Sequence, residues 1–208
     1  MPLARESLLD AAFTALARRP WSAVRMVDVA AVAGVSRQTL YNEFGSKEGL
    51  ARALVRREID SYLLGAERAL RGHPEPRERL AAVAEWTVTA ARSNPLIRAA
   101  LTGLWSERLP TPVLTAVPSS VAIPAQRRAD GPLPSPADLL TLVRDQAVGA
   151  LMAPGTPRSH ATDLARRAEL ALRLALSSIL APVGAGGVAA LVRETLAALP
   201  NLTASPRA

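Results

Sequence analysis

The stretch Gly34-Val-Ser-Arg-Gln-Thr-Leu-Tyr-Asn-Glu-Phe-Gly45 decides the fold of the N-terminal part of this chain. Gly34 can adopt the left-handed conformation that often ends a helix, and Ser36 is a good N-cap for the next one. We therefore expect a helix from about Arg37 to Phe44, preceded by a short amphipathic helix that contains Met26 and Val29. Two short helices separated by about three residues are typical of a helix-turn-helix motif, whose second helix enters the major groove of DNA.

The second helix of this motif carries side chains that suit base recognition. Thr39, Leu40 and Phe44 can be assigned at least partly inward. The polar or half-polar residues that can project outward are Arg37, Gln38, Tyr41 and Asn42. Arginine matches the paired acceptors of guanine, and glutamine or asparagine can match adenine, so this helix can read base edges. We include Thr39 among the predicted DNA-binding residues; an ordinary solvent-exposed helix is the alternative interpretation.

Lys47, the single lysine of the chain, is expected in the first turn of the helix that follows, which Ser46 caps. A lysine at this end of a helix is unfavourable for the helix dipole. Together with the free amides of the helix start, however, it can bind a phosphate beside the recognition helix. A coding bias is the alternative explanation, because all other members of the 25 Lys and Arg residues are arginines.

Composition excludes several classes of function. The 25 basic residues outnumber 18 acidic ones, and the formal net charge of +7 favours a polyanionic partner such as nucleic acid. Without cysteine, disulfides, thiol catalysis and thiolate metal sites are excluded, and a reducing compartment such as the cytoplasm is the default. The two histidines, His73 and His160, have no partner at metal-ligand spacing. We predict no metal site and no catalytic residues.

Apolar residues recur at helical spacing along most of the chain, without a strand pattern or an internal repeat. The fold class is therefore predicted to be all-α. Besides the motif described above, helices are expected over about 5–19, 46–71, 80–93, 96–105, 136–151, 157–181 and 187–199. Residues 110–136 contain seven prolines and are expected to form a long, mobile connector.

The uncharged stretch 174–192 is long enough to suggest a membrane span, but Pro182 and three glycines interrupt it. We interpret it as two helix segments around a turn and predict no membrane partner. The glycines also imitate a dinucleotide-binding loop, yet a leucine-rich helix rather than a strand precedes them. No cofactor is therefore predicted. The N-terminal sequence shows no export signal.

The residues described above resemble the DNA-binding region of the tetracycline-repressor (TetR) family. The similarity covers about residues 5–55, and the Gly-Val-Ser, Thr-Leu-Tyr, Phe and Ser-Lys-Glu elements occur in family order without an insertion. The resemblance implies a dimeric, ligand-responsive transcriptional regulator, usually a repressor. It also implies that Tyr41 and Lys47 contact phosphates, and that the groove is faced by Arg37, Gln38 and Asn42. Residues 56–208 carry little family signature beyond the order of the helices.

Two residues depart from the family pattern. Val24 stands where the family commonly has a threonine that caps the second helix, so that helix lacks a side-chain acceptor unless Ser22 supplies one. Glu43 stands where histidine or another uncharged or basic residue is common. A carboxylate near phosphates weakens binding unless it reaches a cytosine amine or an arginine.

The last two predicted helices are apolar on more than one face, whereas a helix buried on one side needs only one stripe. We expect them to pair across a two-fold axis as a four-helix interface, with a thick monomer core as the alternative. The predicted interface residues are Leu172, Leu176, Ile179, Leu180, Val188, Leu191 and Val192.

A small-molecule cavity is expected between the helices that follow the DNA-binding motif. Trp86, Trp105 and Met152 are suitable wall residues, and the possible polar anchors are Arg98, Arg144 and Gln146. Each of them also fits ordinary packing or surface exposure. The few aromatic and many Ala and Leu residues favour an apolar ligand.

The sequence therefore predicts a helix-turn-helix domain over residues 1–48 and a helical regulatory domain over residues 49–208. The function that these domains favour is a cytoplasmic, homodimeric transcriptional regulator, released from a palindromic double-stranded operator by a small molecule. A helical ligand carrier or enzyme without specific DNA binding is the alternative, and steep salt dependence of duplex binding would separate the two.

Overall fold

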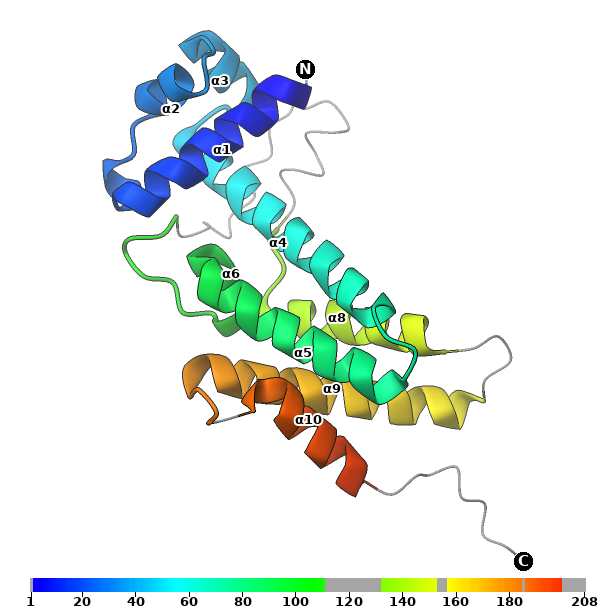
Figure 1. Cartoon of the computed structure of the whole chain (residues 1–208). Helices are drawn as coiled ribbons and strands as arrows, with labels where there is room; N and C mark the ends of the chain where they lie inside the picture. Colours follow the sequence, from blue (N-terminus) through cyan, green and yellow to red (C-terminus); the bar gives the residue numbers. More distant parts are fainter. Residues whose placement is uncertain (1, 111–131, 153–156, 185, 200–208) are drawn as a thin grey trace, which may run out of the picture. The chain divides into compact units, whose positions relative to one another are not determined.

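The computed structural model describes residues 2–110, 132–152, 157–184 and 186–199, and over these ranges the chain is all-helical (Figure 1). The predicted fold class is thereby confirmed. The elements in chain order are α1 (Pro2–Arg18), a 3-10 turn η1 (Trp21–Ala23), α2 (Met26–Val32), α3 (Arg37–Phe44), α4 (Lys47–Arg71), α5 (Pro76–Ser93), α6 (Pro95–Thr102), α8 (Pro136–Leu151), α9 (Arg158–Leu180) and α10 (Gly187–Ala198). Most of the predicted connector at 110–136 lies outside the described residues.

Local signals set most of the helix ends. Ser135 accepts a hydrogen bond from the backbone N–H of Asp138, whose carboxylate accepts one in return from the Ser135 backbone, so α8 starts with a capping box. α6 ends three residues before the expected Trp105, because Gly103 adopts a φ of 73° and closes the helix. α5 starts at Pro76, earlier than its apolar pattern indicated, since proline is well suited to the first helical turn.

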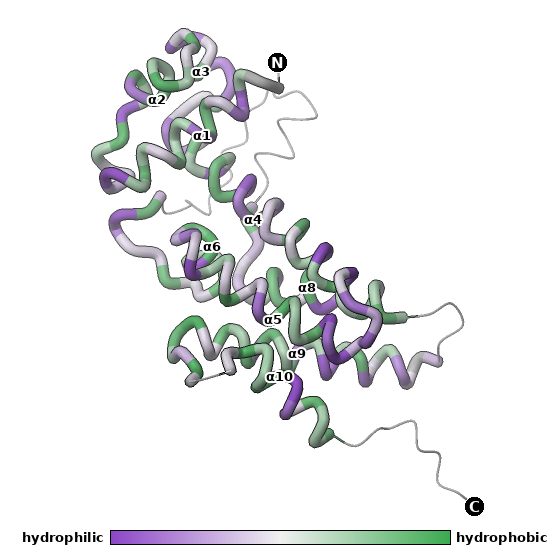
Figure 2. The backbone as a smooth tube through the Cα atoms, in the orientation of Figure 1, coloured by the Kyte–Doolittle hydropathy of each residue, from purple (hydrophilic) through white to green (hydrophobic). Residues whose placement is uncertain are grey.

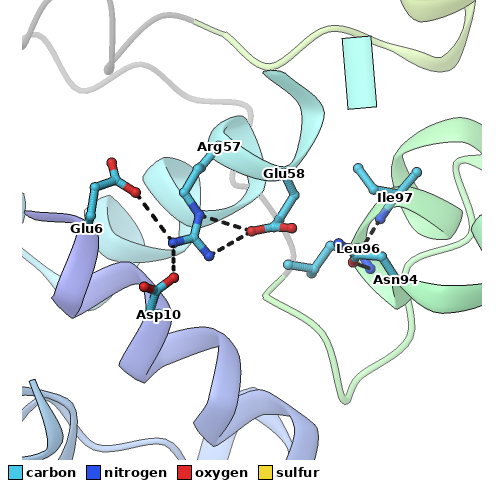
Figure 3. A network of polar contacts seen from close by, with 7 residues as sticks. All are labelled: Glu6, Asp10, Arg57, Glu58, Asn94, Leu96 and Ile97. Atoms are coloured by element: carbon cyan, nitrogen blue, oxygen red, sulfur yellow. Dashed lines mark hydrogen bonds and ion pairs between the residues drawn. The ribbon is translucent and has the colours of Figure 1, made fainter. Parts of the chain in front are cut away.

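The first compact unit comprises residues 1–60 and 104–133. Its core is formed by leucines of α1, α3 and α4 that solvent does not reach, among them Leu8, Leu40 and Leu54. A polar network on α4 adds to this packing: the Arg57 guanidinium contacts Asp10 of α1 at 2.6 Å and Glu6 at 3.6 Å (Figure 3). The first half of α4 is thus part of the N-terminal unit.

The second compact unit comprises residues 61–103 and 134–208. α5 packs against α6, α9 and α10, and α9 also packs against α8 and α10. Each of these helices combines hydrophobic and hydrophilic residues (Figure 2). The hydrophobic residues that are buried include Val83, Leu139, Ala171 and Val192. The division between the compact units falls within α4, after Asp60, whereas the predicted boundary of the DNA-binding domain lies after residue 48.

None of the helices in the described ranges is long and apolar enough to cross a membrane. The stretch that raised this question is divided as expected: α9 ends at Leu180 and α10 begins at Gly187. Gly186 and Gly187 both have positive φ values, which glycine adopts without strain.

Candidate nucleic-acid interface

The turn between α2 and α3 has the predicted helix-turn-helix chemistry. Gly34 has a φ of 68°, and no atom lies within 4 Å of where its Cβ would be, so only the backbone conformation requires glycine here. The Ser36 hydroxyl accepts a hydrogen bond from the Thr39 backbone N–H at 3.0 Å and caps α3. Leu40 is completely buried and fixes the inward face of α3.

The opposite face of α3 presents the predicted base-reading side chains to solvent. Arg37, Gln38, Tyr41 and Asn42 are all exposed. Gln38 Nε2 donates a hydrogen bond to Asn42 Oδ1 at 2.8 Å, so these two amides are already ordered relative to each other. Thr39 is only half-buried, and its hydroxyl lies 2.8 Å from that of Ser36, where it takes part in the cap. Contact of all five side chains with DNA stays a prediction.

Lys47 lies in the first turn of α4, as predicted, but it already has two partners within the chain. Its Nζ donates a hydrogen bond to the Ser22 carbonyl at 3.1 Å and lies 5.6 Å from the centre of the Trp21 ring. The Trp21 backbone N–H in turn donates to the Arg108 carbonyl at 2.8 Å. The cation is therefore held beside η1, at the start of the helix that follows α3. The amide N–H groups of this first turn also favour anions: together with the Ser46 hydroxyl, they lower the pKa of Glu48.

The start of α2 has no side-chain cap, which answers the question raised by Val24 at the position of the usual capping threonine. Its N-cap is Arg25, which makes no side-chain cap, so Ser22 does not supply the missing acceptor. Val24 itself is buried. Asp28 in the first turn pairs with Arg25 at 2.9 Å and with Arg19 at 3.2 Å, and these guanidinium groups lower the pKa of its carboxyl. An acidic side chain thus complements the dipole of α2.

Glu43 reaches an arginine, one of the two compensating arrangements that the sequence allowed. Arg5 Nη1 of α1 donates a hydrogen bond to Glu43 Oε1 at 2.8 Å. The same guanidinium lies 4.8 Å from the centre of the Phe44 ring. The negative charge on α3 is therefore paired within the chain.

A separate apolar cavity of about 10 Å³ lies within the second unit. It is lined by Tyr62, Thr87, Leu101, Pro136, Leu139, Leu140, Val143, Leu172 and Leu176. Thr87 Oγ1 donates to the Val83 carbonyl at 2.8 Å and lies 3.0 Å from the Tyr62 hydroxyl. Burial raises the pKa of Tyr62 to about 12, which keeps this phenol neutral.

None of the predicted ligand residues lines this small cavity, but Trp86 lines a second, more open cavity of about 350 Å³ in the same unit, together with Glu85 and Arg193. The Trp86 indole donates to the Tyr62 carbonyl at 3.0 Å and packs against Gly65, so it faces α4 instead of the small cavity. Arg144 is paired with Asp145, and Met152 caps the end of α8. Trp105 belongs to the first unit, whereas the cavity lies in the second. Of the other two candidates, Arg98 is exposed on α6, and Gln146 has a buried Oε1 without a hydrogen-bond partner. Tyr62 and Thr87 were not among the predicted ligand residues, although both line this cavity.

Most of the predicted dimer residues are buried within the chain itself. Ile179, Val188 and Val192 belong to its core, while Leu172 and Leu176 line the cavity. Leu191 is half-buried. Leu180, at the end of α9, is 58% exposed and remains available to a partner. Many of the apolar residues of α9 and α10 are thus buried inside the second unit, and pairing of these helices across a two-fold axis stays a prediction.

This chain is similar in sequence to known transcriptional regulators. Residues 8–54 match the family described as bacterial regulatory proteins, tetR family. The chain is 53% identical to the HTH-type transcriptional regulator AlkX of Mycobacterium tuberculosis over 58 residues, 28% of each protein. It is 28% identical to the HTH-type transcriptional repressor KstR of Mycolicibacterium smegmatis over 178 residues, 84% of this chain and 87% of that one.

Solved structures agree on the fold. A tetR-family transcriptional regulator from Streptomyces coelicolor superposes with a TM-score of 0.52 at 17% identity, over 93% of this chain and 77% of that chain. The chain spans between 28% and 52% of the length of the first curated relatives that it matches.

Proposed function

Because this chain belongs to the TetR family of bacterial regulatory proteins, we propose that it regulates transcription by binding operator DNA through α3. The observation that carries the proposal is the two-sided character of α3: Leu40 is completely buried on one face, and four side chains suited to DNA are exposed on the other. Such a helix is held firmly by the protein while it reads the major groove. We expect a regulator of this kind to act in the cytoplasm, where bacterial DNA is found.

The amide pair on α3 suits an adenine. With Gln38 Nε2 donating to Asn42 Oδ1, the Gln38 Oε1 acceptor and the Asn42 NH₂ donors remain available. Adenine presents one acceptor, N7, and one donor, N6, in the major groove. Arg37, one residue earlier, suits guanine. We expect Tyr41 and Lys47 to add phosphate contacts that carry no sequence information.

Selection from a randomised duplex library, followed by affinity measurements on the selected duplex at several salt concentrations, tests this function. We expect Gln38→Ala to relax the preference at one base pair by about 1–3 kcal/mol, and Tyr41→Ala to weaken binding to all duplexes. Ligand binding without salt-dependent duplex binding would refute regulation and favour a helical ligand carrier or enzyme.

The regulator is proposed to act as a homodimer on a palindromic operator. Two recognition helices about 34–36 Å apart can enter successive major grooves of one face of the duplex. Leu180, at the end of α9, is the predicted interface residue that is most exposed and therefore available to a partner. Repression is the proposed outcome of binding, because the M. smegmatis relative that matches most of this chain is named a repressor, although another M. smegmatis relative that matches a shorter part is named an activator.

The effector is proposed to be a small, neutral, largely aliphatic molecule that binds at the cavity of the second unit. The lining includes no charged side chain, so an ionised ligand would lose its hydration without gaining a partner. Since the Thr87 hydrogen is donated to Val83, Tyr62 donates to Thr87 and keeps only acceptor capacity on its own oxygen. A ligand hydroxyl that donates to Tyr62 fits this arrangement.

The cavity as it stands holds roughly one water, so a ligand of several heavy atoms must move the surrounding helices. This requirement gives the ligand a different affinity for the two states, which release from DNA demands. Thermal shifts with primary alcohols and carboxylic acids of equal chain length test the ligand class. We expect the alcohols to stabilise the protein more, and Tyr62→Phe to remove their advantage; stabilisation by the carboxylates would refute it.

A further inference from the structure

Arg5 stands at an unusual place on α1. It lies near the N-terminal end of that helix, where a cation is unfavourable for the helix dipole, and no acidic residue occupies the first turn to compensate. The stability of α1 alone therefore does not explain an arginine here. Its side chain is only 28% exposed and is directed to α3.

The contacts of Arg5 converge on the last two residues of the recognition helix. Its Nη1 lies 2.8 Å from Glu43 Oε1, and its guanidinium carbon lies 4.8 Å from the centre of the Phe44 ring. Phe44 is the final residue of α3, and Gly45 ends the helix with a φ of 70°. The guanidinium thus holds the end of α3 at two points, one ionic and one aromatic.

The same guanidinium also supplies a charge that α3 lacks. Helices are stabilised by cations near their C-terminal ends, but α3 has no basic residue in its last turn. Arg5 provides this cation from another helix. Three effects therefore agree: pairing with Glu43, packing on Phe44 and complementing the dipole of α3.

We propose that Arg5 is a positioning residue that fixes the orientation of α3 through Glu43 and Phe44, and that sequence discrimination depends on this pair. The inference rests on the proposed function of α3. Base recognition requires the amides of Gln38 and Asn42 to meet base edges at hydrogen-bond distance, whereas attraction to phosphates tolerates small rotations of the helix. Loosening the end of α3 therefore reduces specific binding more than non-specific binding.

For Glu43→Gln, a positioning role of Arg5 and simple electrostatics predict opposite effects on DNA binding. Glu43→Gln removes a negative charge from the DNA-binding unit, which by charge alone strengthens binding to any duplex. If Glu43 serves as the partner of Arg5, the same substitution weakens binding to the selected operator and lowers the ratio of specific to non-specific affinity.

The test measures affinities of the full chain for its selected duplex and for a scrambled duplex at one salt concentration. The variants are Arg5→Gln, Glu43→Gln and the double variant, each checked for helical content and thermal stability. Arg193→Gln is the matched control, because Arg193 pairs with Glu78 at 2.8 Å between α10 and α5, outside the first unit. We expect the ratio to fall about two- to fivefold in both single variants and no further in the double variant. The control keeps the wild-type ratio.

Several results would overturn the inference. If Arg5→Gln weakens both duplexes equally, Arg5 is a phosphate contact and not a positioning residue. If Glu43→Gln leaves the ratio unchanged or raises it, the pair does not orient α3. A wild-type chain that fails to distinguish any duplex would instead refute the proposed function, which separates the two failures.

Discussion

The single lysine of the chain allows the proposed phosphate contact to be measured directly. Lys47→Gln keeps N–H donors on a slightly shorter side chain and loses the charge and the interaction with the Trp21 ring. That ring interaction stabilises the fold by only about 0.5–1 kcal/mol, and the variant should stay folded. Each neutralised phosphate contributes about 0.9 to the slope of log affinity against log salt. Removing one contact should therefore lower the slope by about 0.9.

Between 50 and 200 mM salt the concentration rises about fourfold, so the advantage of the wild type over Lys47→Gln should shrink by about 3.5-fold. Fluorescence anisotropy of a labelled duplex measures this ratio. Lys47→Arg is the control: it keeps the charge and should keep the slope. Acetylation with an amine-reactive reagent offers an independent readout, since duplex binding should protect Lys47. An unchanged slope in Lys47→Gln, with full modification in the complex, would refute the phosphate contact.

Four further changes have defined outcomes. Gly65→Ala should destabilise the chain by about 1–3 kcal/mol, because the new Cβ would lie 2.1 Å from the Trp86 ring, whereas Gly149→Ala meets no atom within 4 Å and should be neutral or stabilising in thermal melts. Leu180→Glu should yield monomers in sedimentation, and Leu64→Glu, equally exposed at 59%, should not; dimers in both would place the interface elsewhere. The pKa of Asp138 is lowered by the Ser135 cap, so its stabilising effect is present above the unfolded pKa and lost as the pH falls through the folded one; Asp138→Asn should flatten the acid side of the stability profile. Arg57→Gln should leave the affinity for the effector unchanged but should reduce the factor by which the effector weakens DNA binding, because the pair with Asp10 of α1 is lost. If this factor is unaltered, the pair does not contribute to the coupling between effector and DNA.

The predictable part of the fold is the part that local chemistry determines. The range of α3 and the ends of α4 follow from Ser36, Gly45, Ser46 and apolar spacing, and all of these signals lie within a few residues of the helix ends. The division within α4 could not be predicted this way. It depends on the reach of Arg57 to α1, over more than forty residues of sequence, and no local pattern records such a contact.

In the candidate site, too, features set by local spacing were predictable and contacts between distant residues were not. Exposure of Arg37, Gln38, Tyr41 and Asn42 follows from the helical period alone, because Leu40 fixes the inward face. The partners of Lys47 and Glu43 come from η1 and α1, so spacing could name these residues but not their contacts. The walls of the small cavity were not predicted for a similar reason: large aromatic residues suggested a pocket, but Trp86 packs on Gly65 of its neighbouring helix and lines a different, larger cavity.

The continuity of α4 links the two parts of the proposed function. Tyr62 lines the cavity and Arg57 pairs with α1, and both lie on α4. Five residues of helix correspond to about 7.5 Å along the axis, without a break at which motion could be absorbed. A ligand that enters a cavity too small for it must displace some of its walls, and Tyr62 is held among them by Thr87. We therefore propose that a displacement of Tyr62 would be transmitted along α4 to Arg57, which pairs with Asp10 of α1.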